Sequence, residues 1–324
     1  MVGRAIYADS GTVKIGGKIE NISSDNDMWQ GTGGFIVHLR QSAEGTVTST
    51  AVIDNGSKST SGNALSVFKD CSLLLENGSV VKSFKDCNVF YVQQDNAVLY
   101  MDGEVTDCSG SSHIVQANSD AFIITIGENA EIHDNTVGYG AIYAFSNNNA
   151  SGKCGTINVY GKINNNLSTD RGGAIAMANN GSNLSVNMYE GAEICNNIST
   201  QTGGGILVSC GTFTMYGGTI SNNISGANVS GEADQAGGGV FVRRGGIFKM
   251  YGGSITNNYA AGIGGGIAFE AGDYNNCVPN VQLVSGTISG NKMNADISSA
   301  GEGYSAQNGE SNDIAITSDG SSHI

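Results

Sequence analysis

A sequence motif that recurs along this chain limits its possible folds more than any other feature of the sequence. The stretch GTFTMYGGTISNN at 211–223 returns as GGIFKMYGGSITNN at 245–258. Periods of about 20–50 residues are typical of solenoids, in which each unit buries its apolar side only against its neighbours. The isoleucine of the I-x-x-N phrase marks each repeat, with spacings of 31, 31, 26, 35 and 33 residues, at Ile132, Ile163, Ile194, Ile220, Ile255 and Ile288.

Alternating side chains within each repeat indicate three short β-strands. In 212–216, Phe213 and Met215 face one way and Tyr216 the other, and a glycine pair then permits a bend. Such a unit covers its apolar side when each strand pairs in parallel with its equivalent in the next unit. The sequence therefore predicts an all-β fold, a right-handed parallel β-helix of about ten coils, with the hand taken from the rule for parallel crossovers. A glycine cluster opens the last strand of each unit, as in GGAIAMA (172–178), GGGILVS (203–209), GGGVFVR (237–243) and GGGIAFE (264–270).

The repeats predict a single solenoid domain over 1–324. Residues 130–291 contain the regular repeats, residues 1–129 contain irregular coils with related sequence motifs, and residues 292–324 form a terminal coil. The composition agrees, because 49 Gly, 1 Pro and 14% charged residues favour turn-rich β structure over helices.

An asparagine stands three residues after each marker isoleucine. We interpret this row as a structural ladder, because an amide side chain can donate and accept at once and so satisfy backbone groups that a bend would bury. A ligand-binding asparagine row is the alternative. The ladder residues are Asn135, Asn166, Asn197, Asn223, Asn258 and Asn291.

Tyrosines occupy a second repeat position, and the alternation points them outward. Stacked at strand spacing, they would form an aromatic row able to lie against sugar rings or a partner protein. The alternative is that they only stabilise the sheet by cross-strand contact. The polar segments 224–236 and 271–280 are a second candidate for recognition, as loops at a solenoid edge often are. The row comprises Tyr160, Tyr189, Tyr216 and Tyr251.

The search for catalytic residues in the sequence leads to none. Hydrolysis of a polysaccharide would need clustered carboxylates, and acids such as Asp134, Asp170 and Glu193 form no repeated or clustered set. We expect Glu270 to pair with Arg243 as a cross-strand ion pair. The four histidines receive no role. The seven cysteines show no Cys-x-x-Cys or Cys/His ligand spacing, so we predict no metal and no cofactor.

Net charge and hydropathy restrict the classes of partner and the cellular location that this chain can have. A formal net charge of −14 argues against nucleic-acid binding, which needs clustered Lys and Arg. No apolar run has the length of a membrane-spanning helix, and the N-terminus has no signal-peptide core. Either the protein stays inside the cell or this is a piece of a longer exported chain.

Over about residues 130–291 the repeat motifs resemble those of known repeat families. GGAI or GGGI/V paired with hydrophobic-x-x-Asn resembles the GGA[ILV] and FxxN repeats of chlamydial polymorphic outer-membrane proteins. GTFTMYGGTISNN followed by GGGVFV is still more similar to repeats of large adhesin-like surface proteins of anaerobic Gram-positive bacteria, in the pectate-lyase-like β-helix superfamily. This chain departs from the pattern by having Ile where FxxN has Phe, and by Gly290, which interrupts the doubled asparagine.

The resemblance implies a non-catalytic adhesin or stalk at the bacterial cell surface or secreted, part of a longer surface protein, that binds a host or environmental glycan or protein. Two other functions stay open. Many right-handed β-helices are polysaccharide lyases or glycoside hydrolases, and others are phage tail fibres or tailspike-like proteins.

Overall fold

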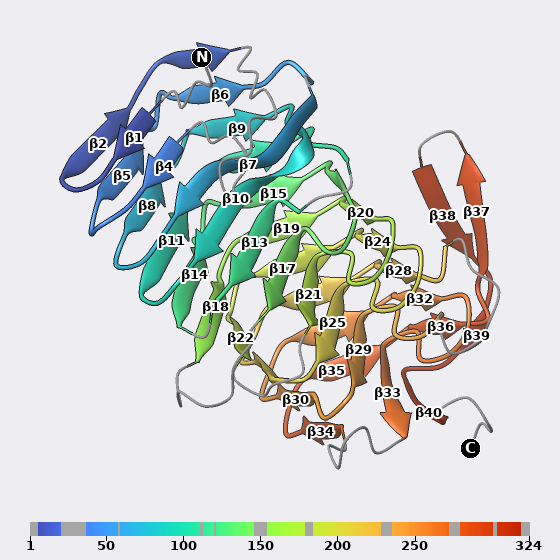
Figure 1. Cartoon of the computed structure of the whole chain (residues 1–324). Coiled ribbons are helices and arrows are strands. Elements are labelled where there is room, and N and C mark those ends of the chain that lie inside the picture. Colours follow the sequence, from blue (N-terminus) through green and yellow to red (C-terminus); the bar gives the residue numbers. More distant parts are fainter. Residues whose placement is uncertain are drawn as a thin grey trace.

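The computed structural model describes residues 6–20, 37–57, 59–110, 113–119, 121–145, 154–178, 184–227, 235–271, 279–300 and 303–318. Within these residues every regular element is a β-strand and no helix occurs. The strands follow one another around successive coils, which stack into a solenoid (Figure 1). The predicted all-β class and parallel stacking are confirmed, and the right-handed sense of winding stays a prediction.

Three long parallel sheets form the walls of the solenoid. Sheet 1 contains, in spatial order, β1 (Ile6–Ala8), β4 (Val37–Leu39), β7 (Ser59–Val67), β10 (Lys85–Gln93), β13 (Val115–Asn118), β17 (Ile142–Phe145), β21 (Ile175–Ala178), β25 (Ile206–Ser209), β29 (Val240–Arg243), β33 (Ile267–Ala271) and β40 (Ile314–Ser318). Sheet 2 contains β2 (Thr12–Ile15), β5 (Glu44–Val47), β8 (Ser72–Leu75), β11 (Ala97–Met101), β14 (Phe122–Ile126), β18 (Gly155–Val159), β22 (Leu184–Met188), β26 (Thr212–Met215), β30 (Ile247–Met250) and β34 (Asn280–Leu283). Sheet 3 contains β3 (Lys18–Glu20), β6 (Val52–Asp54), β9 (Val80–Lys82), β12 (Glu104–Thr106), β15 (Glu131–His133), β19 (Lys162–Asn164), β23 (Glu193–Cys195), β27 (Thr219–Ser221), β31 (Ser254–Thr256) and β35 (Thr287–Ser289).

A fourth sheet corrects the prediction of three strands per coil. Its strands are two residues long and too short for alternation to reveal them, and all of them except the last, β39, follow directly after a ladder asparagine. Sheet 4 begins only at Thr136, so fewer than ten coils contain all four strands. Sheets 1, 2 and 3 contain eleven, ten and ten strands, respectively. Sheet 4 contains β16 (Thr136–Val137), β20 (Leu167–Ser168), β24 (Ile198–Ser199), β28 (Ile224–Ser225), β32 (Tyr259–Ala260), β36 (Lys292–Met293) and β39 (Glu310–Ser311).

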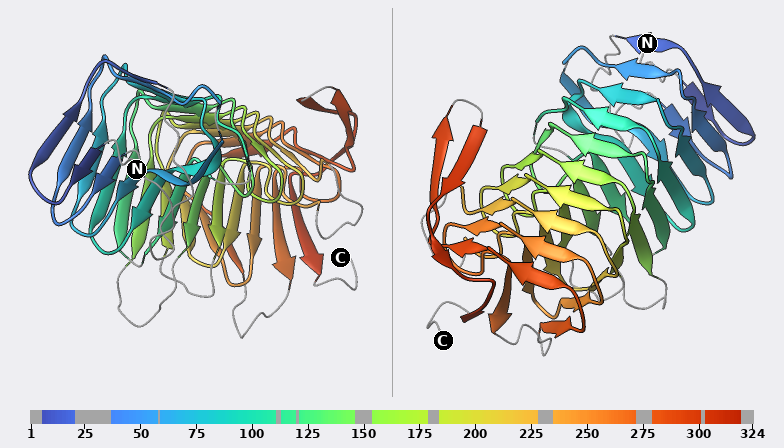
Figure 2. Two further views of the ribbon diagram at one scale, coloured as in Figure 1. Left: turned by 45° about the horizontal axis from the view of Figure 1, so that its top comes forward. Right: turned by 180° about the vertical axis from the view of Figure 1, so that it is seen from behind.

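The terminal segment departs from the parallel pattern. β39 pairs antiparallel with β36, and β37 (Asp296–Ala300) forms an antiparallel hairpin with β38 (Gly303–Gln307). This hairpin projects away from the stacked sheets (Figure 2). β40 then returns to the solenoid as the last strand of sheet 1, parallel to β33.

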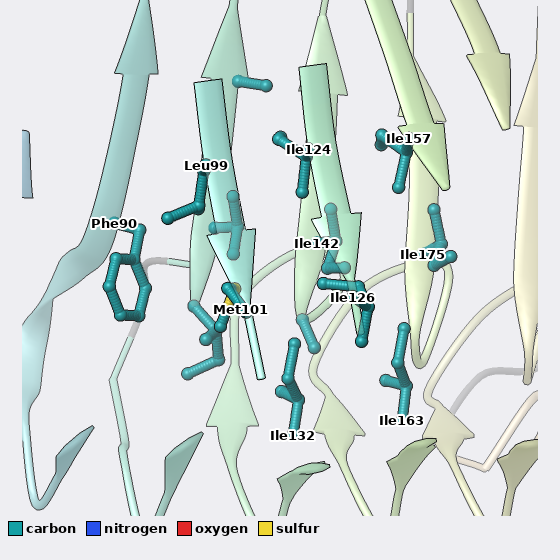
Figure 3. Close-up of a cluster of buried hydrophobic side chains, with 14 of the residues drawn as sticks. Phe90, Leu99, Met101, Ile124, Ile126, Ile132, Ile142, Ile157, Ile163 and Ile175 are labelled. Carbon is teal, nitrogen blue, oxygen red and sulfur yellow. The ribbon is translucent and has the colours of Figure 1, made fainter. Parts of the chain in front are cut away.

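The core consists of apolar columns along the solenoid axis. Ile132, Ile163 and Ile194 pair in register from coil to coil and are fully buried, as the repeat predicts. Side chains from sheets 1, 2 and 3 meet in the interior (Figure 3). Each side chain therefore packs against its equivalent above and below, as well as across the coil.

The predicted asparagine ladder is present inside the bend between sheets 3 and 4. All six side chains are at most 1% exposed. Each ladder step has the same pattern. The backbone N–H and Nδ2 of Asn197 both donate to Oδ1 of Asn223, at 2.9 and 3.1 Å, and Nδ2 also donates to the carbonyl of Ile163 at 2.8 Å. The ladder thus satisfies backbone groups that the bend buries.

Two residues outside the predicted ladder form its ends. At one end the backbone N–H of Cys108 donates to Oδ1 of Asn135 at 3.0 Å. At the other, Oδ1 of Asp313 accepts from the backbone N–H and Nδ2 of Asn291, at 3.1 and 2.8 Å. A carboxylate only accepts when ionised, which makes Asp313 an end point rather than another step.

The residue before each ladder asparagine serves a different purpose from the ladder itself. These residues take the left-handed conformation, with φ of 54° at Asp134 and 56° at Asn222. Asn, Asp and Gly adopt this conformation more readily than other residues. Gly290, which interrupts the doubled asparagine, occupies the same position with φ of 72°. The doubled asparagine is therefore one turn residue followed by one ladder residue.

The glycine clusters are required partly by a left-handed backbone conformation and partly by the close backbone of the next coil. Gly203 has φ of 67°, which explains the first glycine of its cluster. A Cβ on Gly204 would lie 2.4 Å from the carbonyl oxygen of Gly238, and one on Gly238 would lie 2.4 Å from that of Gly265. The second glycine of each cluster is thus fixed by the close stacking of backbones.

Candidate binding surface

The four predicted tyrosines form a continuous stack along the corner between sheets 2 and 3. Ring centroids are 4.3 Å apart between Tyr160 and Tyr189, 5.5 Å between Tyr189 and Tyr216, and 5.8 Å between Tyr216 and Tyr251. The ring planes differ by 5° to 18°. Each tyrosine follows the last inward residue of its sheet 2 strand, such as Met215 before Tyr216, so all four point outward as predicted.

Exposure of the row increases toward its C-terminal end. Tyr160 and Tyr189 are half-buried, whereas Tyr216 is 51% and Tyr251 43% exposed. Val284, which occupies the equivalent position in the next coil, is 66% exposed. Because the rings stack on one another, an inner ring turns its faces to its neighbours and presents its edge and hydroxyl to solvent. Only the two end rings have a face without a tyrosine neighbour in the row.

Tyr100 extends this surface beyond the repeat that revealed it. Tyr100 is 40% exposed and lies two positions earlier in its coil than the row tyrosines. Its hydroxyl would lie 2.9 Å from a Cβ on Gly127, the residue at the row position of the next coil, so it reaches over this glycine toward Tyr160. Burial, and then the charges of Asp102 and Glu128, raise the pKa of Tyr100 above its ordinary value. The phenol therefore stays neutral and can donate a hydrogen bond at neutral pH.

A polar column runs beside the row on sheet 2. Asn158 and Asn187 stand two residues before Tyr160 and Tyr189, and Nδ2 of Asn187 donates to Oδ1 of Asn158 at 3.2 Å. Thr214 and Lys249 hold the equivalent places in the following coils. Thr214 is only 6% exposed, so the amides of Asn158 and Asn187 and the ammonium group of Lys249 are the groups that line one side of the stacked rings, a combination that can bind a hydroxyl-rich or peptide ligand.

The structure also gathers titratable groups that the sequence analysis did not bring together. Glu104 and Glu131 are direct register partners on β12 and β15. Nε2 of His133 lies 3.1 Å from Oε1 of Glu104, and Nδ1 lies 2.7 Å from Oδ2 of Asp134. This group was not predicted from the sequence, where the histidines received no role and Asp134 was treated as part of no cluster. The similar motifs GEVTD, at 103–107, and AEIHD, at 130–134, are the sequence signal that would have revealed the proximity of Glu104 to His133.

The environment of His133 favours its protonated form. Burial opposes protonation, but hydrogen bonds with Asp134 and Glu104 and the charge of Glu131 outweigh it and raise the pKa of the imidazole above its ordinary value. Nδ2 of Asn164 donates to Oε1 of Glu131 at 2.9 Å and partly compensates that carboxylate. His133 therefore keeps its proton to a higher pH than a free histidine does.

The expected Arg243–Glu270 ion pair is not formed. The two residues are neighbours across β29 and β33, but the side-chain contact of Glu270 is with the backbone N–H of Arg244, at 3.3 Å from Oε2. No ion pair between Arg243 and Glu270 is present among the described residues, and this part of the chain also places no three His, Cys, Asp or Glu side chains to hold a metal ion. Most of the second candidate surface, at 228–234 and 272–278, lies outside the described residues.

Comparisons with protein-family models, with curated proteins and with solved structures found no match to this chain. In the described residues, no helix has the length and apolar character needed to cross a membrane.

Proposed function

We propose that this chain is a non-catalytic β-solenoid that acts as an adhesin or stalk on a bacterial surface or in a secreted protein, and that it binds a glycan or a host protein through the tyrosine row. The observation that carries the proposal is the stack of Tyr160, Tyr189, Tyr216 and Tyr251 on the outside of the shaft, with its C-terminal half the most exposed. Exposed aromatic residues in a contiguous group are typical of recognition surfaces.

The geometry of the stack favours an extended ligand that lies along the solenoid axis. Hydroxyls recur once per coil, and the column of Asn158, Asn187, Thr214 and Lys249 recurs beside them. A linear chain would meet a tyrosine hydroxyl at every coil, with the Asn158 and Asn187 amides and the Lys249 ammonium group beside three of the four, whereas a compact ligand would meet only one such step. The net charge of −14 disfavours a polyanion.

A glycan array followed by titration tests this proposal. We expect the double variant Tyr216→Ala and Tyr251→Ala to lose binding to any ligand that the wild type binds. The matched control is Tyr7→Ala, because Tyr7 is also an exposed tyrosine, 44% exposed, but lies on sheet 1 away from the row. Binding that is unchanged in the double variant would contradict the assignment of the row.

Phenylalanine variants separate two ways in which the row can bind. Tyr216→Phe with Tyr251→Phe keeps the stacked rings and removes two hydroxyls. Since the ring faces are largely turned to one another, we expect this variant to lose most of the binding that the alanine variant loses. Full retention of binding would show that ring edges and apolar contact carry the affinity.

A polysaccharide-degrading enzyme is the second candidate, and the specific observation in its favour is the group of Glu104, Glu131, His133 and Asp134. Paired carboxylates are the requirement for glycoside hydrolysis. A reducing-sugar assay over the same glycans separates the two functions. Turnover that is lost in Glu131→Gln would overturn the non-catalytic proposal.

A further inference from the structure

A pocket of about 290 Å³ opens at the corner between sheets 1 and 2, in the N-terminal part of the solenoid. Its lining comes from three successive coils, at the points where the chain leaves β4, β7 and β10. The tyrosine row lies at another corner, between sheets 2 and 3, and does not account for these side chains. The pocket is lined by Arg40, Gln41, Phe68, Lys69, Asp70 and Gln94.

The pocket lies where the connections from sheet 1 to sheet 2 change in length. The strand registers leave four connecting residues in two neighbouring coils, 40–43 and 68–71, but five in the next coil, 93–97. Two shorter connections therefore lie beside a longer one, and side chains of all three line the pocket. The coils form this pocket together, so no single repeat reveals it.

Phe68 forms the apolar wall of the pocket. It is only 9% exposed, and its ring lies on the outer side of sheet 1, with its centroid 4.7 Å from that of His38 and 6.3 Å from that of Tyr91. These two ring contacts hold Phe68 in place, so the wall is formed before a ligand arrives. A flat apolar group can pack against such a ring edge-to-face or offset.

Positive charge exceeds negative charge in this pocket, although the chain as a whole carries a net charge of −14. Arg40 and Lys69 contribute two positive charges and Asp70 one negative charge, and all three residues are exposed. A guanidinium group can bind both oxygens of a carboxylate through parallel N–H groups. Asp70 would repel a doubly charged anion more strongly than a singly charged one. The pocket therefore suits a ligand with one negative charge.

Two glutamines of the pocket have a backbone conformation that this residue type rarely adopts. The φ angle is 52° at Gln41 and 74° at Gln94, in the left-handed region where Gly, Asn and Asp are usual. Backbone strain of this kind is concentrated at ligand sites in proteins. The two amide side chains can donate to and accept from a ligand, which a glycine at the same place could not do.

We propose that this pocket binds a small monocarboxylic acid with a flat apolar body. The carboxylate would accept hydrogen bonds from Arg40 and Lys69, and the apolar body would pack against Phe68. The volume of the pocket is sufficient for one ligand of this size and is at the lower end of the range for small-molecule sites. This site does not depend on the function proposed for the tyrosine row.

Isothermal titration with sodium benzoate at constant ionic strength tests this site. We expect saturable binding of benzoate to the wild type. Benzamide has the same shape without the charge, and acetate has the charge without the ring, so each should bind at least about tenfold more weakly than benzoate. Sulfate, which carries two charges and no apolar body, should also bind more weakly than benzoate.

Substitution of the two cations tests their role in the site. Arg40→Gln and Lys69→Gln should each weaken benzoate binding about tenfold, as expected for loss of a charge-assisted hydrogen bond. Lys85→Gln is the matched control. Lys85 is also exposed and begins β10, whereas Gln94 follows the other end of that strand. The control removes the same charge from the same coil and should leave benzoate binding unchanged.

Gln94→Gly separates a role in binding from a role in the fold. Glycine adopts a φ of 74° without strain, so we expect the urea midpoint not to fall, while benzoate binding weakens severalfold. The proposal is overturned if benzoate gives no saturable heat, if benzamide or sulfate binds as tightly as benzoate, or if the variants at Arg40 and Lys69 bind benzoate as the wild type does.

Discussion

The asparagine ladder and the tyrosine row have the same period in the sequence but opposite places in the molecule. The ladder lies inside the bend, at most 1% exposed, and each step is made by two or three hydrogen bonds. The row lies on the outside, with Tyr216 51% exposed, and its steps are ring contacts at 4.3 to 5.8 Å. A repeat therefore identifies equivalent positions without saying what they contribute, since burial decides whether a lost contact can be replaced by water.

Removing one ladder residue should give the largest loss of stability. Asn223→Ala leaves the backbone N–H and Nδ2 of Asn197 without their acceptor and the carbonyl of Ile194 without its donor. Because these groups are buried, we expect the free energy of unfolding to fall by about 3–5 kcal/mol. Urea titration measures this, with Asn187→Ala on the outer face as control. A loss below about 1 kcal/mol for Asn223→Ala would contradict the buried ladder as the main polar support of the coils.

The turn residue beside the ladder should matter less. Asn222 has φ of 56°, so Asn222→Ala places a side chain in the left-handed region and should cost about 1 kcal/mol. Asn222→Gly should stay within about 0.5 kcal/mol of the wild type, because the equivalent position is glycine at Gly290. The two variants are compared by thermal and urea unfolding. Equal losses in both would show that the Asn222 side chain has a role beyond the turn.

The outer row should contribute little to stability even where it matters for binding. Tyr216→Ala removes two stacking contacts and should lower the free energy of unfolding by less than about 1 kcal/mol. The measurement is the same urea titration as for Asn223→Ala. If the two losses were equal, the contrast between the inner and outer rows would fail, and the tyrosines would count as structural.

His133 should give the smallest effect, and one that depends on pH. The pKa of His133 is raised in the folded chain, so its stabilising contribution is complete below the unfolded value of about 6.5 and is lost as the pH rises through the folded pKa. We expect His133→Gln to lower the free energy of unfolding by about 0.5 kcal/mol at pH 5, as for a partly exposed ion pair, and by less at pH 8. Unfolding at both pH values measures the difference. A larger effect at pH 8 would contradict the direction of the shift.

The sequence predicted well those features that one repeat unit contains. The side on which Phe213, Met215 and Tyr216 lie follows from alternation, and the ladder follows from the fixed distance between isoleucine and asparagine. The fourth sheet was missed because its strands are two residues long. The grouping of Glu104 with His133 was missed because Glu104 precedes the regular repeats, although the sequence around Glu104 is similar to that around Glu131.

By itself, then, the sequence determined the solenoid, its inward and outward positions and its two periodic rows, since these depend on local alternation and on period alone. The tertiary structure decided which residues of different coils meet, because coil lengths vary and the corners fold back over the sheets. Only the stacked backbones show why Gly238 excludes a side chain and why the ladder ends at Asp313.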